Sequence, residues 1–447
     1  MVRAPRQRWR CFIIDPHHEI IAHAAGSAAR GLDMDKSRVP GFRAVVSIRD
    51  QLSRWLVEDA LPLWDRFGVD RAAGGYFETV AAGVAGGLVG EGAVRRGRVV
   101  ARQIYVFSVG QRFGWRSGFS CPVDHGGAYL LSRLHRGDGH FLTAVDAAGG
   151  GAHGPFSLYE QAFYLFALAH LVRGRAAVQP VAVIARRCLE RLRNGYGRES
   201  GGFEESDPPS RPLKSNPHMH LLEAALAWLA VAEDDAQQPW EELARELVGL
   251  CLTRFRDARS GAIREYFDGD WLPMPGAAGR IVEPGHQFEW AWLLTQWAHG
   301  PHCGVERTAC LDAASRLVEL GENAGVDVGR GVAVNEVWDD MTLKEGDAKL
   351  WPQTERLKAW CARLECAEDV VQATAACDGI VRAAHGMLQY FRSDTPGLWH
   401  EVRLAQGEFP KGPSKASSFY HVVCAIEVLD RTVRAAGTAS NGFIVAT

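Results

Sequence analysis

The sequence lacks the features that mark several large classes of protein. No run of apolar residues reaches the roughly 18 that a membrane-spanning helix needs. The formal net charge is only −3, which gives no electrostatic basis for binding nucleic acid or an anionic membrane surface. We therefore expect neither a nucleic acid nor a membrane among the partners of this chain.

Motifs for metals, disulfides and common cofactors are also missing. The ten cysteines are scattered without a Cys-x-x-Cys pair, and several, such as Cys188 and Cys251, lie in apolar helical patterns where a thiol packs as a small hydrophobic group. There is no His-Glu-x-x-His, no zinc-ligand spacing, no Walker motif and no Gly-x-Ser-x-Gly. The sequence thus predicts a cytoplasmic protein with no metal and no cofactor.

The N-terminal region shows no sustained hydrophobic period. Arginine is frequent among its first residues, but the only apolar block that follows is Cys11–Ile14, which is too short for the core of a signal peptide. We expect residues 1–44 to be a poorly ordered extension, residues 45–437 to form one catalytic domain, and residues 438–447 to be a C-terminal tail.

A repeated element organises the proposed domain. A glycine that leads into a short strand-like piece recurs at intervals of about 60 to 70 residues, and two helical patterns lie between successive members. The repeat glycines are Gly75, Gly139, Gly202, Gly261, Gly331 and Gly397. The helices are predicted near 46–67, 99–116, 122–136, 157–173, 177–193, 216–232, 238–256, 285–299, 304–321, 350–364, 367–390 and 415–435.

Six helical hairpins of this size predict an all-α (α/α)6 barrel of twelve helices with short β-hairpin loops, and an open solenoid is the alternative. The second helix of each pair is the more apolar, so it should line the interior. Two of these helices begin with recognisable start signals: Ser157-x-x-Glu160 is a capping box, and Asn216-Pro217 reads as an N-cap followed by proline. Because the helices of a repeat run in one direction, their first turns should meet at one mouth.

The stretch Glu283–Leu294 places ionisable groups in a core-facing helix. His286 and Glu289 are three residues apart and therefore share one face. Burying such a pair is costly unless it is partnered or functional. A hydrogen-bonded core histidine with a capping glutamate is the alternative interpretation of this stretch taken alone.

The other inner helices also begin with polar residues that a purely structural core would not use. These are Arg102, Gln103, Tyr159, Glu160, Asn216, His218, His220, Trp351, Gln353, Glu355 and His421. His218 and His220 are two residues apart, so at most one faces inward, and the helical period favours His220. Aromatic rings around a polar floor suit a sugar.

The same segments resemble the N-acylglucosamine 2-epimerase superfamily, and within it the mannose isomerase-type aldose–ketose isomerases. The similarity runs from about Leu52 to Asp430. It rests on Arg102-Gln103-Ile104-Tyr105, Tyr159-Glu160-Gln161-Ala162-Phe163, Asn216-Pro217-His218-Met219-His220-Leu221-Leu222-Glu223-Ala224, Glu283–Trp290, Leu350-Trp351-Pro352-Gln353-Thr354-Glu355 and Ser418-Phe419-Tyr420-His421.

The resemblance implies an (α/α)6 barrel with His286 and His421 as catalytic residues. It also implies substrate-binding roles for Arg102, Tyr159, Asn216, His220, Glu289 and Trp351, and we assign the same role to Glu355. Two positions depart from the superfamily pattern: Glu160 stands where relatives usually have Asp, and Lys349 where an arginine commonly precedes Leu-Trp-Pro-Gln.

Isomerisation and 2-epimerisation both open the sugar ring and then remove the proton on C2. Histidine suits these steps because its pKa lies near neutrality. We assign His286 to the proton transfer and His421 to ring opening, with Arg102 and His220 as donors to the developing oxyanion and Glu289 as the group that orients His286.

The expected reaction is the interconversion of D-mannose and D-fructose through a cis-enediolate, by a monomer or homodimer. One alternative is a 2-epimerase acting on N-acylglucosamine or a related sugar. Another is a glycoside hydrolase or lyase on the same barrel that uses Glu289 and Glu355 as its carboxylate pair. A non-catalytic sugar-binding protein is a third.

Overall fold

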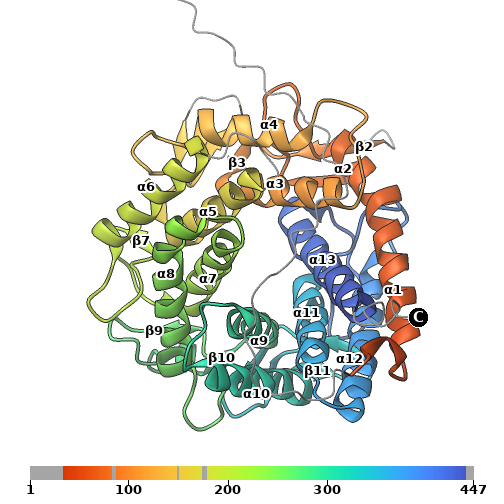
Figure 1. The fold of residues 1–447 in the computed structure, drawn as a ribbon. Coiled ribbons are helices and arrows are strands. Elements are labelled where there is room, and N and C mark those ends of the chain that lie inside the picture. The colour runs from red at the N-terminus through yellow and green to blue at the C-terminus, as the bar shows by residue number, and fades with distance from the viewer. Residues whose placement is uncertain (1–33, 83–86, 148–150, 174–178, 439–447) are drawn as a thin grey trace, which may run out of the picture.

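Two concentric rings of helices form the protein (Figure 1). The structure is a computed structural model that describes residues 34–82, 87–147, 151–173 and 179–438. Within these residues, the outer helices are α1 (Phe42–Arg54) with α2 (Leu61–Phe67), α4 (Pro122–Tyr129), α6 (Gln179–Tyr196), α8 (Gln238–Leu250), α10 (Arg307–Gly325) and α12 (Val370–Leu388). The inner helices are α3 (Gly97–Arg112), α5 (Leu158–Val172), α7 (Ser215–Leu229), α9 (Pro284–His299), α11 (Leu350–Cys366) and α13 (Ala416–Thr438).

The inner helices close into a ring, so the barrel prediction is confirmed. Each packs on the next along the chain, and α13 returns to pack on α3. A π-helical segment, Trp55–Ala60, joins α1 to α2 into one outer helix, and similar segments, Leu130–Leu134 and Cys251–Phe255, extend α4 and α8. With these extensions, every predicted helix is present and its ends differ from the prediction by at most four residues.

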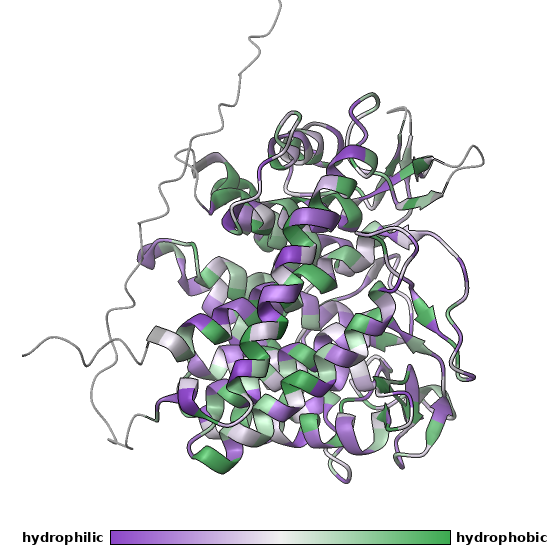
Figure 2. Cartoon of the chain, turned by 90° about the vertical axis from the view of Figure 1, so that its right-hand side faces the viewer, coloured by the Kyte–Doolittle hydropathy of each residue, from purple (hydrophilic) through white to green (hydrophobic). Residues whose placement is uncertain are grey.

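The hydrophobic pattern explains which helices are inside. α9 is buried almost continuously from Pro284 to Ala298, as expected for a helix packed on all sides. α1 buries Phe42, Val45, Ile48 and Leu52, which form the single stripe of an amphipathic outer helix. Figure 2 shows the outer helices carrying both hydrophilic and hydrophobic residues, with the strands gathered at one end of the barrel.

The strands are two to four residues long and form seven small antiparallel sheets within the described residues. Their orders are β17 (Ser414–Lys415), β1 (Thr79–Ala82), β2 (Leu88–Glu91); β3 (Val94–Arg96), β4 (Ala144–Asp146), β5 (Ala152–His153); β6 (Phe156–Ser157), β7 (Ser206–Asp207); β8 (Leu213–Lys214), β9 (Tyr266–Phe267); β10 (Ile281–Val282), β13 (Glu336–Trp338), β14 (Leu343–Glu345); β11 (Val326–Asp327), β12 (Val332–Ala333); and β15 (Ala348–Lys349), β16 (Val402–Arg403).

These pairings fix where the inner helices begin. The strand just before each inner helix pairs with a strand of the following unit, and β17, before α13, pairs with β1 of the first unit. The first turns of all six inner helices are therefore held side by side at the strand-bearing end, which is the predicted mouth.

The repeat glycines lie in tight hairpins after the outer helices. All six have φ between 71° and 88°, a left-handed conformation that glycine adopts without steric cost. Side chains of the inner helices hold several hairpins in place. Gln161 exchanges two hydrogen bonds with the backbone of Phe141, and Gln353 does the same with Ala333. Gln353 thus belongs to the barrel wall.

The N-terminal prediction can be followed only in part. Residues 1–33 and 439–447 lie outside the described residues. Residues 34–44, which the sequence assigned to the extension, include the start of α1 at Phe42, and Lys36 Nζ donates to the carbonyl oxygens of Leu364 and Glu365 at 2.9 and 2.8 Å.

No helix among the described residues is long and apolar enough to cross a membrane. The buried cysteines of the described residues, which are Cys188, Cys251, Cys303, Cys310, Cys361, Cys377 and Cys424, form no disulfide within that part of the chain.

Candidate active site

A cavity of about 300 Å³ opens at the mouth where the inner helices begin. It is lined by Arg102, Tyr159, Asn216, His220, Glu283, His286, Glu289, Lys349, Trp351, Glu401, Val402, Lys415, Ser417, Ser418 and His421. All six inner helices contribute, and the lining includes every predicted site residue except Glu355. Glu355 lies behind His421 and is fully buried.

His286 is held between carboxylates. Its Nδ1 lies 2.8 Å from Glu265 Oε2 and 3.8 Å from Glu283 Oε2. Burial alone would lower the pKa of His286, but the negative charges of Glu265 and Glu283 outweigh it and raise the pKa to about 10. The ring is therefore an imidazolium at neutral pH, and its Nδ1–H donates to Glu265.

The second nitrogen of His286 faces an adaptable partner. His286 Nε2 lies 3.2 Å from Asn216 Nδ2, while Asn216 Oδ1 has no partner among the described residues. A half-turn of the amide would present Oδ1 to a protonated Nε2, so Asn216 can serve both protonation states of the ring. The sequence interpretation of Asn216 as an N-cap is wrong: α7 begins at Ser215, so the cap position is Lys214 and the Asn216 side chain is free to face the cavity.

His421 has a different environment. Its Nδ1 lies 2.8 Å from Glu355 Oε1, which leaves Nε2 as the ring nitrogen available to the cavity. Burial, followed by the positive charges of Arg102 and Lys358, lowers the pKa of His421 well below its usual range. The two candidate catalytic histidines thus rest in opposite states, one charged and one neutral.

Trp351 lies between these two histidines. Its ring centroid is 4.9 Å from that of His286 and 5.9 Å from that of His421. This approach requires glycine at position 285, because a Cβ there would come within 2.4 Å of the Trp351 ring.

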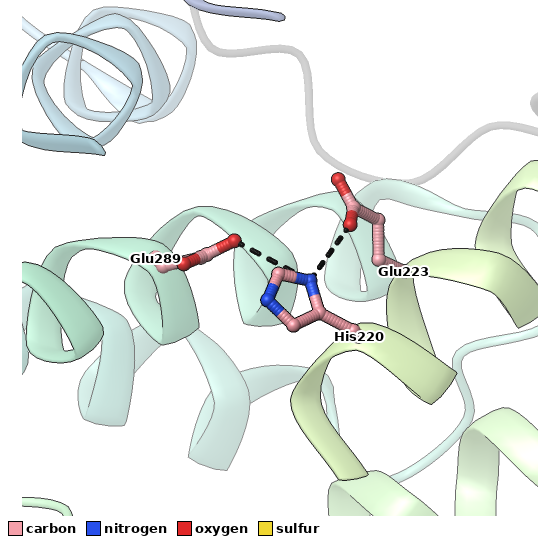
Figure 3. A group of neighbouring side chains, drawn as sticks. All are labelled: His220, Glu223 and Glu289. Carbon is pink, nitrogen blue, oxygen red and sulfur yellow. Dashed lines mark hydrogen bonds and ion pairs between the residues drawn. The ribbon is translucent and has the colours of Figure 1, made fainter. Parts of the chain in front are cut away.

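His220 and Glu289 of the cavity lining form a cluster of ionisable groups with Glu223, which lies behind them (Figure 3). His220 Nδ1 lies 3.1 Å from Glu223 Oε2 and 3.8 Å from Glu289 Oε1. Burial raises the pKa of Glu223, but the hydrogen bond with His220 and other positive neighbours lower it to about 2. Tyr420 donates its hydroxyl proton to the same carboxylate.

Glu289 differs from its neighbours in having no hydrogen-bond partner. Neither carboxyl oxygen is bonded within the described residues, and only 1% of the residue is exposed. Burial, followed by the charge of Glu355, raises the pKa of Glu289 well above its usual value. Glu289 is therefore a neutral acid that faces the cavity, and Glu265 rather than Glu289 orients His286.

Arg102 brings a positive charge with no carboxylate partner within the described part of the chain. It donates to the Tyr159 hydroxyl at 2.8 Å and to the Ser417 carbonyl at 3.3 Å. Its guanidinium lies 4.1 Å from the centre of the Phe163 ring. Stacking and the two neutral acceptors hold Arg102 in place without neutralising it, so its charge is available to a ligand oxygen.

Other predicted residues have structural contacts. His218 is fully buried, and its Nε2 accepts a hydrogen bond from the Phe203 N–H at 3.1 Å. Ser157 caps α5 as predicted, but the Glu160 carboxylate binds Arg98 instead of completing the capping box.

The sequence analysis missed two carboxylates that build the site, Glu265 and Glu401. Each lies four residues after the repeat glycine of its unit, which is Gly261 or Gly397. Glu265 accepts a hydrogen bond from the N–H of Glu283, and Glu401 from that of Lys415, the residue just before the inner helix in each case. Glu78 and Glu205 do the same in other units, by accepting from the N–H groups of Arg96 and Lys214. A carboxylate that recurs at this position of the repeat is the sequence feature that could have identified Glu265 and Glu401.

Three groups of side chains have the donor types and spacing that a metal ion needs. They are His220, Glu223 and Glu289; Glu265, Glu283 and His286; and Glu289, Glu355 and His421, with ligand atoms within 4.8 Å of one another in each. In the third group, the Lys358 ammonium already lies 2.5 Å from Glu355 Oε2 and supplies a positive charge.

Comparisons with known proteins agree with this geometry. The sequence model of the family described as N-acylglucosamine 2-epimerase matches residues 74–425, which hold the whole lining of the cavity. The chain belongs to the N-acylglucosamine 2-epimerase family. A family member from Rhizobium meliloti (strain 1021), named mannose-6-phosphate isomerase, is 40% identical over 391 residues, covering 85% of this chain and 96% of that relative.

Solved structures of the family share the fold. Cellobiose 2-epimerase from Spirochaeta thermophila superposes with a TM-score of 0.72 at 20% identity, covering 88% of this chain and 98% of that one. A D-mannose isomerase gives 0.69 at 18% identity, with coverage of 89% and 98%. The names of the relatives and the matching family make this chain an enzyme of the isomerase class, in the group of aldose–ketose isomerases and 2-epimerases.

Proposed function

We propose that the protein interconverts D-mannose and D-fructose through ring opening and a cis-enediolate. The observation that carries the proposal is the pair of histidines beside Trp351, each with Nδ1 bonded to a buried carboxylate and each resting in the opposite charge state. One cavity thus contains an acid and a base, which is what proton transfers between neighbouring sugar atoms require.

Ring opening uses both histidines. Neutral His421 takes the proton of the O1 hydroxyl through Nε2, and protonated His286 gives its Nε2 proton to the ring oxygen O5. The C1–O5 bond breaks and the aldehyde forms without net charge change. This step leaves His286 neutral, with Glu265 still bonded to Nδ1, so the ring becomes a strong base.

Proton transfer then follows on carbon. His286 removes the proton on C2, which gives an enediolate with its charge on O1, and returns that proton to C1. Protonated His421 gives a proton to O1 and takes one from the O2 hydroxyl, so the carbonyl moves from C1 to C2. The unpaired charge of Arg102 stabilises the enediolate oxygens. His220 departs from the donor role expected from the sequence: its Nδ1 is bonded to the Glu223 carboxylate and burial lowers its pKa, so its Nε2 accepts a hydrogen bond from a sugar hydroxyl.

The remaining predicted residues take supporting roles. Tyr159, Asn216 and Trp351 line the cavity and contact the sugar, and neutral Glu289 donates a hydrogen bond to one of its oxygens. Glu355 is fully buried and lies outside the cavity lining, and it orients His421 by accepting a hydrogen bond from Nδ1.

Isomerisation is favoured over 2-epimerisation because of the number of available bases. Epimerisation needs an acid or base on each face of C2, whereas isomerisation needs one beside C1 and C2. Because His421 exchanges protons with the sugar oxygens, His286 is the one histidine left to exchange protons with C1 and C2. The names of two relatives, mannose-6-phosphate isomerase and D-mannose isomerase, support the same choice.

Mannose 6-phosphate is a second candidate substrate. Lys349 and Lys415 line the cavity, and their ammonium groups form no ion pair within the described residues. These two ammonium groups in the cavity lining would suit a phosphate on C6, and the relative from Rhizobium meliloti bears that substrate's name. Comparing kcat/KM for mannose and mannose 6-phosphate decides between them.

A glycoside hydrolase or lyase fits the cavity poorly. The carboxylates of such enzymes flank the scissile bond from about 5 to 9.5 Å apart. Oxygens of Glu289 and Glu355 lie within 4.8 Å of each other, and Glu355 is fully buried against Lys358.

The test is conversion of a panel of free aldoses in deuterated water. We expect fructose from mannose, with part of the unlabelled C2 hydrogen found on C1 because a shielded histidine returns the proton it took. A product that is only the C2 epimer, with deuterium at C2, would refute the isomerase and identify a 2-epimerase.

A further inference from the structure

A buried lysine stands behind His421. Lys358, on α11, is 0% exposed, and its Nζ lies 2.5 Å from Glu355 Oε2. The same ammonium is 4.1 Å from the Trp292 ring centre and 3.7 Å from Cys424 Sγ. Lys358 is absent from the cavity lining, so it cannot touch a substrate there.

A fully buried lysine of this kind is not explained by protein stability alone. Moving an ammonium out of water costs several kcal/mol, and a packed apolar side chain in place of a buried ion pair is often equally stable or better. Lys358 also shares Glu355 with His421, because Oε2 pairs with the Lys358 ammonium and Oε1 lies 2.8 Å from His421 Nδ1. The contacts therefore form a chain from Lys358 through Glu355 to the imidazole that faces the cavity.

We propose that Lys358 is a positioning residue that sets the tautomer of His421 by holding Glu355 as a carboxylate. An ionised carboxylate can only accept a hydrogen bond, so Nδ1 of His421 must carry the ring proton. Nε2 then has its lone pair free toward the cavity. The inference rests on the proposed function, in which that lone pair takes the O1 proton.

Without Lys358 the hydrogen bond would reverse. A neutral Glu355 could donate its own proton to Nδ1, which places the ring proton on Nε2 and turns the base into a donor. The groups facing Glu355 are Lys358 and Thr354 on α11, His220 and Glu223 on α7, Glu289 on α9, and His421 and Cys424 on α13.

Lys358 is the lysine of that set, and the carboxyl groups of Glu289 and Glu223 also interact with its ammonium group. Burial raises the pKa of Glu355, and Lys358 is the largest influence that opposes the rise. Replacing Lys358 with a neutral side chain of similar length therefore favours proton uptake by Glu355.

The test is Lys358→Met, with the protonation of His421 read by ¹⁵N NMR of histidine-labelled protein and assigned by its absence in His421→Ala. We expect the ring proton on Nδ1 in the wild type and on Nε2 in Lys358→Met. The kcat should fall by about 10²-fold or more, the scale of losing a general base. An unchanged tautomer in Lys358→Met would overturn the proposal.

Arg356→Met is the matched control. Arg356 is a buried cation on the same helix, bonded to Glu322 at 2.6 Å, and it faces α10 instead of the cavity. Its loss should lower the melting temperature and leave the His421 tautomer unchanged. A tautomer change in this variant as well would mean that loosening α11 is the cause, and would refute the role of Lys358.

A double variant separates positioning from folding. If Lys358 acts only through His421, Lys358→Met should reduce kcat no further in a His421→Ala background. Losses that multiply would contradict the proposal.

The wild-type protein alone provides a second measurement should Lys358→Met fail to fold. The ¹³C carboxyl resonance of Glu355, assigned with Glu355→Gln, should be that of a carboxylate from pH 6 to 8. A neutral Glu355 in this range would refute the inference. Neither NMR result depends on which sugar is turned over, so failure of the proposed function remains distinguishable.

Discussion

Changing Glu265 to glutamine tests the electrostatic basis of the site most directly. Glutamine keeps the size of the side chain and can still accept the Glu283 N–H, but it removes the negative charge 2.8 Å from His286 Nδ1. The rise of the His286 pKa from 6.5 to about 10 corresponds to roughly 5 kcal/mol in favour of the charged ring. Glu265 is the largest contributor to that rise, so the variant should lose much of it.

Two results should follow from Glu265→Gln. The His286 pKa should fall to about its ordinary value or lower, because burial then acts with less opposition. The kcat at pH 7 should fall by about 10²- to 10⁴-fold, since the ring loses both its proton and its orienting partner. NMR titration of His286 and the pH–rate profile measure these effects.

Stability provides an independent readout with a defined sign. A histidine whose pKa is raised on folding binds more protons in the native state, so its stabilisation is complete below pH 6.5 and is lost as the pH rises toward 10. Denaturant unfolding of the wild type should weaken across that window, and the loss should be smaller in Glu265→Gln.

Glu205→Gln is the matched control. Glu205 occupies the same position of another unit, accepts the Lys214 N–H and lies outside the cavity lining. It should leave the His286 titration unchanged. The reasoning would be refuted if His286 stayed protonated to pH 9 in Glu265→Gln, or if both variants gave the same effect.

The remaining predictions concern other parts of the site and the chain. His286→Ala and His421→Ala should each lower kcat by at least about 10²-fold with folding preserved, and near-wild-type turnover would make that residue structural. Exhaustive chelation should leave turnover intact, and activity that returns only with added zinc or manganese would contradict the metal-free mechanism. Deleting residues 1–44 removes the Lys36 contacts and buried Val39 and Phe42, at a cost of about 3 kcal/mol or more; unchanged melting of the truncated chain would show that these contacts add nothing. Gly285→Ala should displace Trp351 and raise KM with little effect on melting, and unchanged kinetics would exclude Trp351 from substrate contact.

The fold could be predicted because the features that specify it recur at regular intervals along the sequence. The repeat glycines mark the left-handed hairpin positions, and the pattern of the inner helices shows which helices are buried on all sides. Helical phase also brought Arg102, Asn216, His286 and His421 to one mouth, since their placement depends only on position within the first two turns of an inner helix.

The partners of those residues could not be predicted in the same way. Helical spacing suggested Glu289 as the group that orients His286, yet Glu265 from the preceding hairpin does so. Spacing along a helix identifies residues on the same face, but not which carboxylate from a neighbouring strand reaches an imidazole. Lys358 was missed because an apolar helix face gives no sign that an ammonium group lies within it.

The pairing of β17 with β1 has a consequence for folding. In an open array each unit can fold on its neighbour and add its own increment of stability. Here the last unit must find the first across more than three hundred residues before the ring is complete, a contact of very high sequence separation. His421 from the last inner helix and Arg102 from the first meet only when that closure occurs. Regain of turnover during refolding should therefore lag behind regain of helical circular dichroism. The enzyme's own activity then reports when the ring closes.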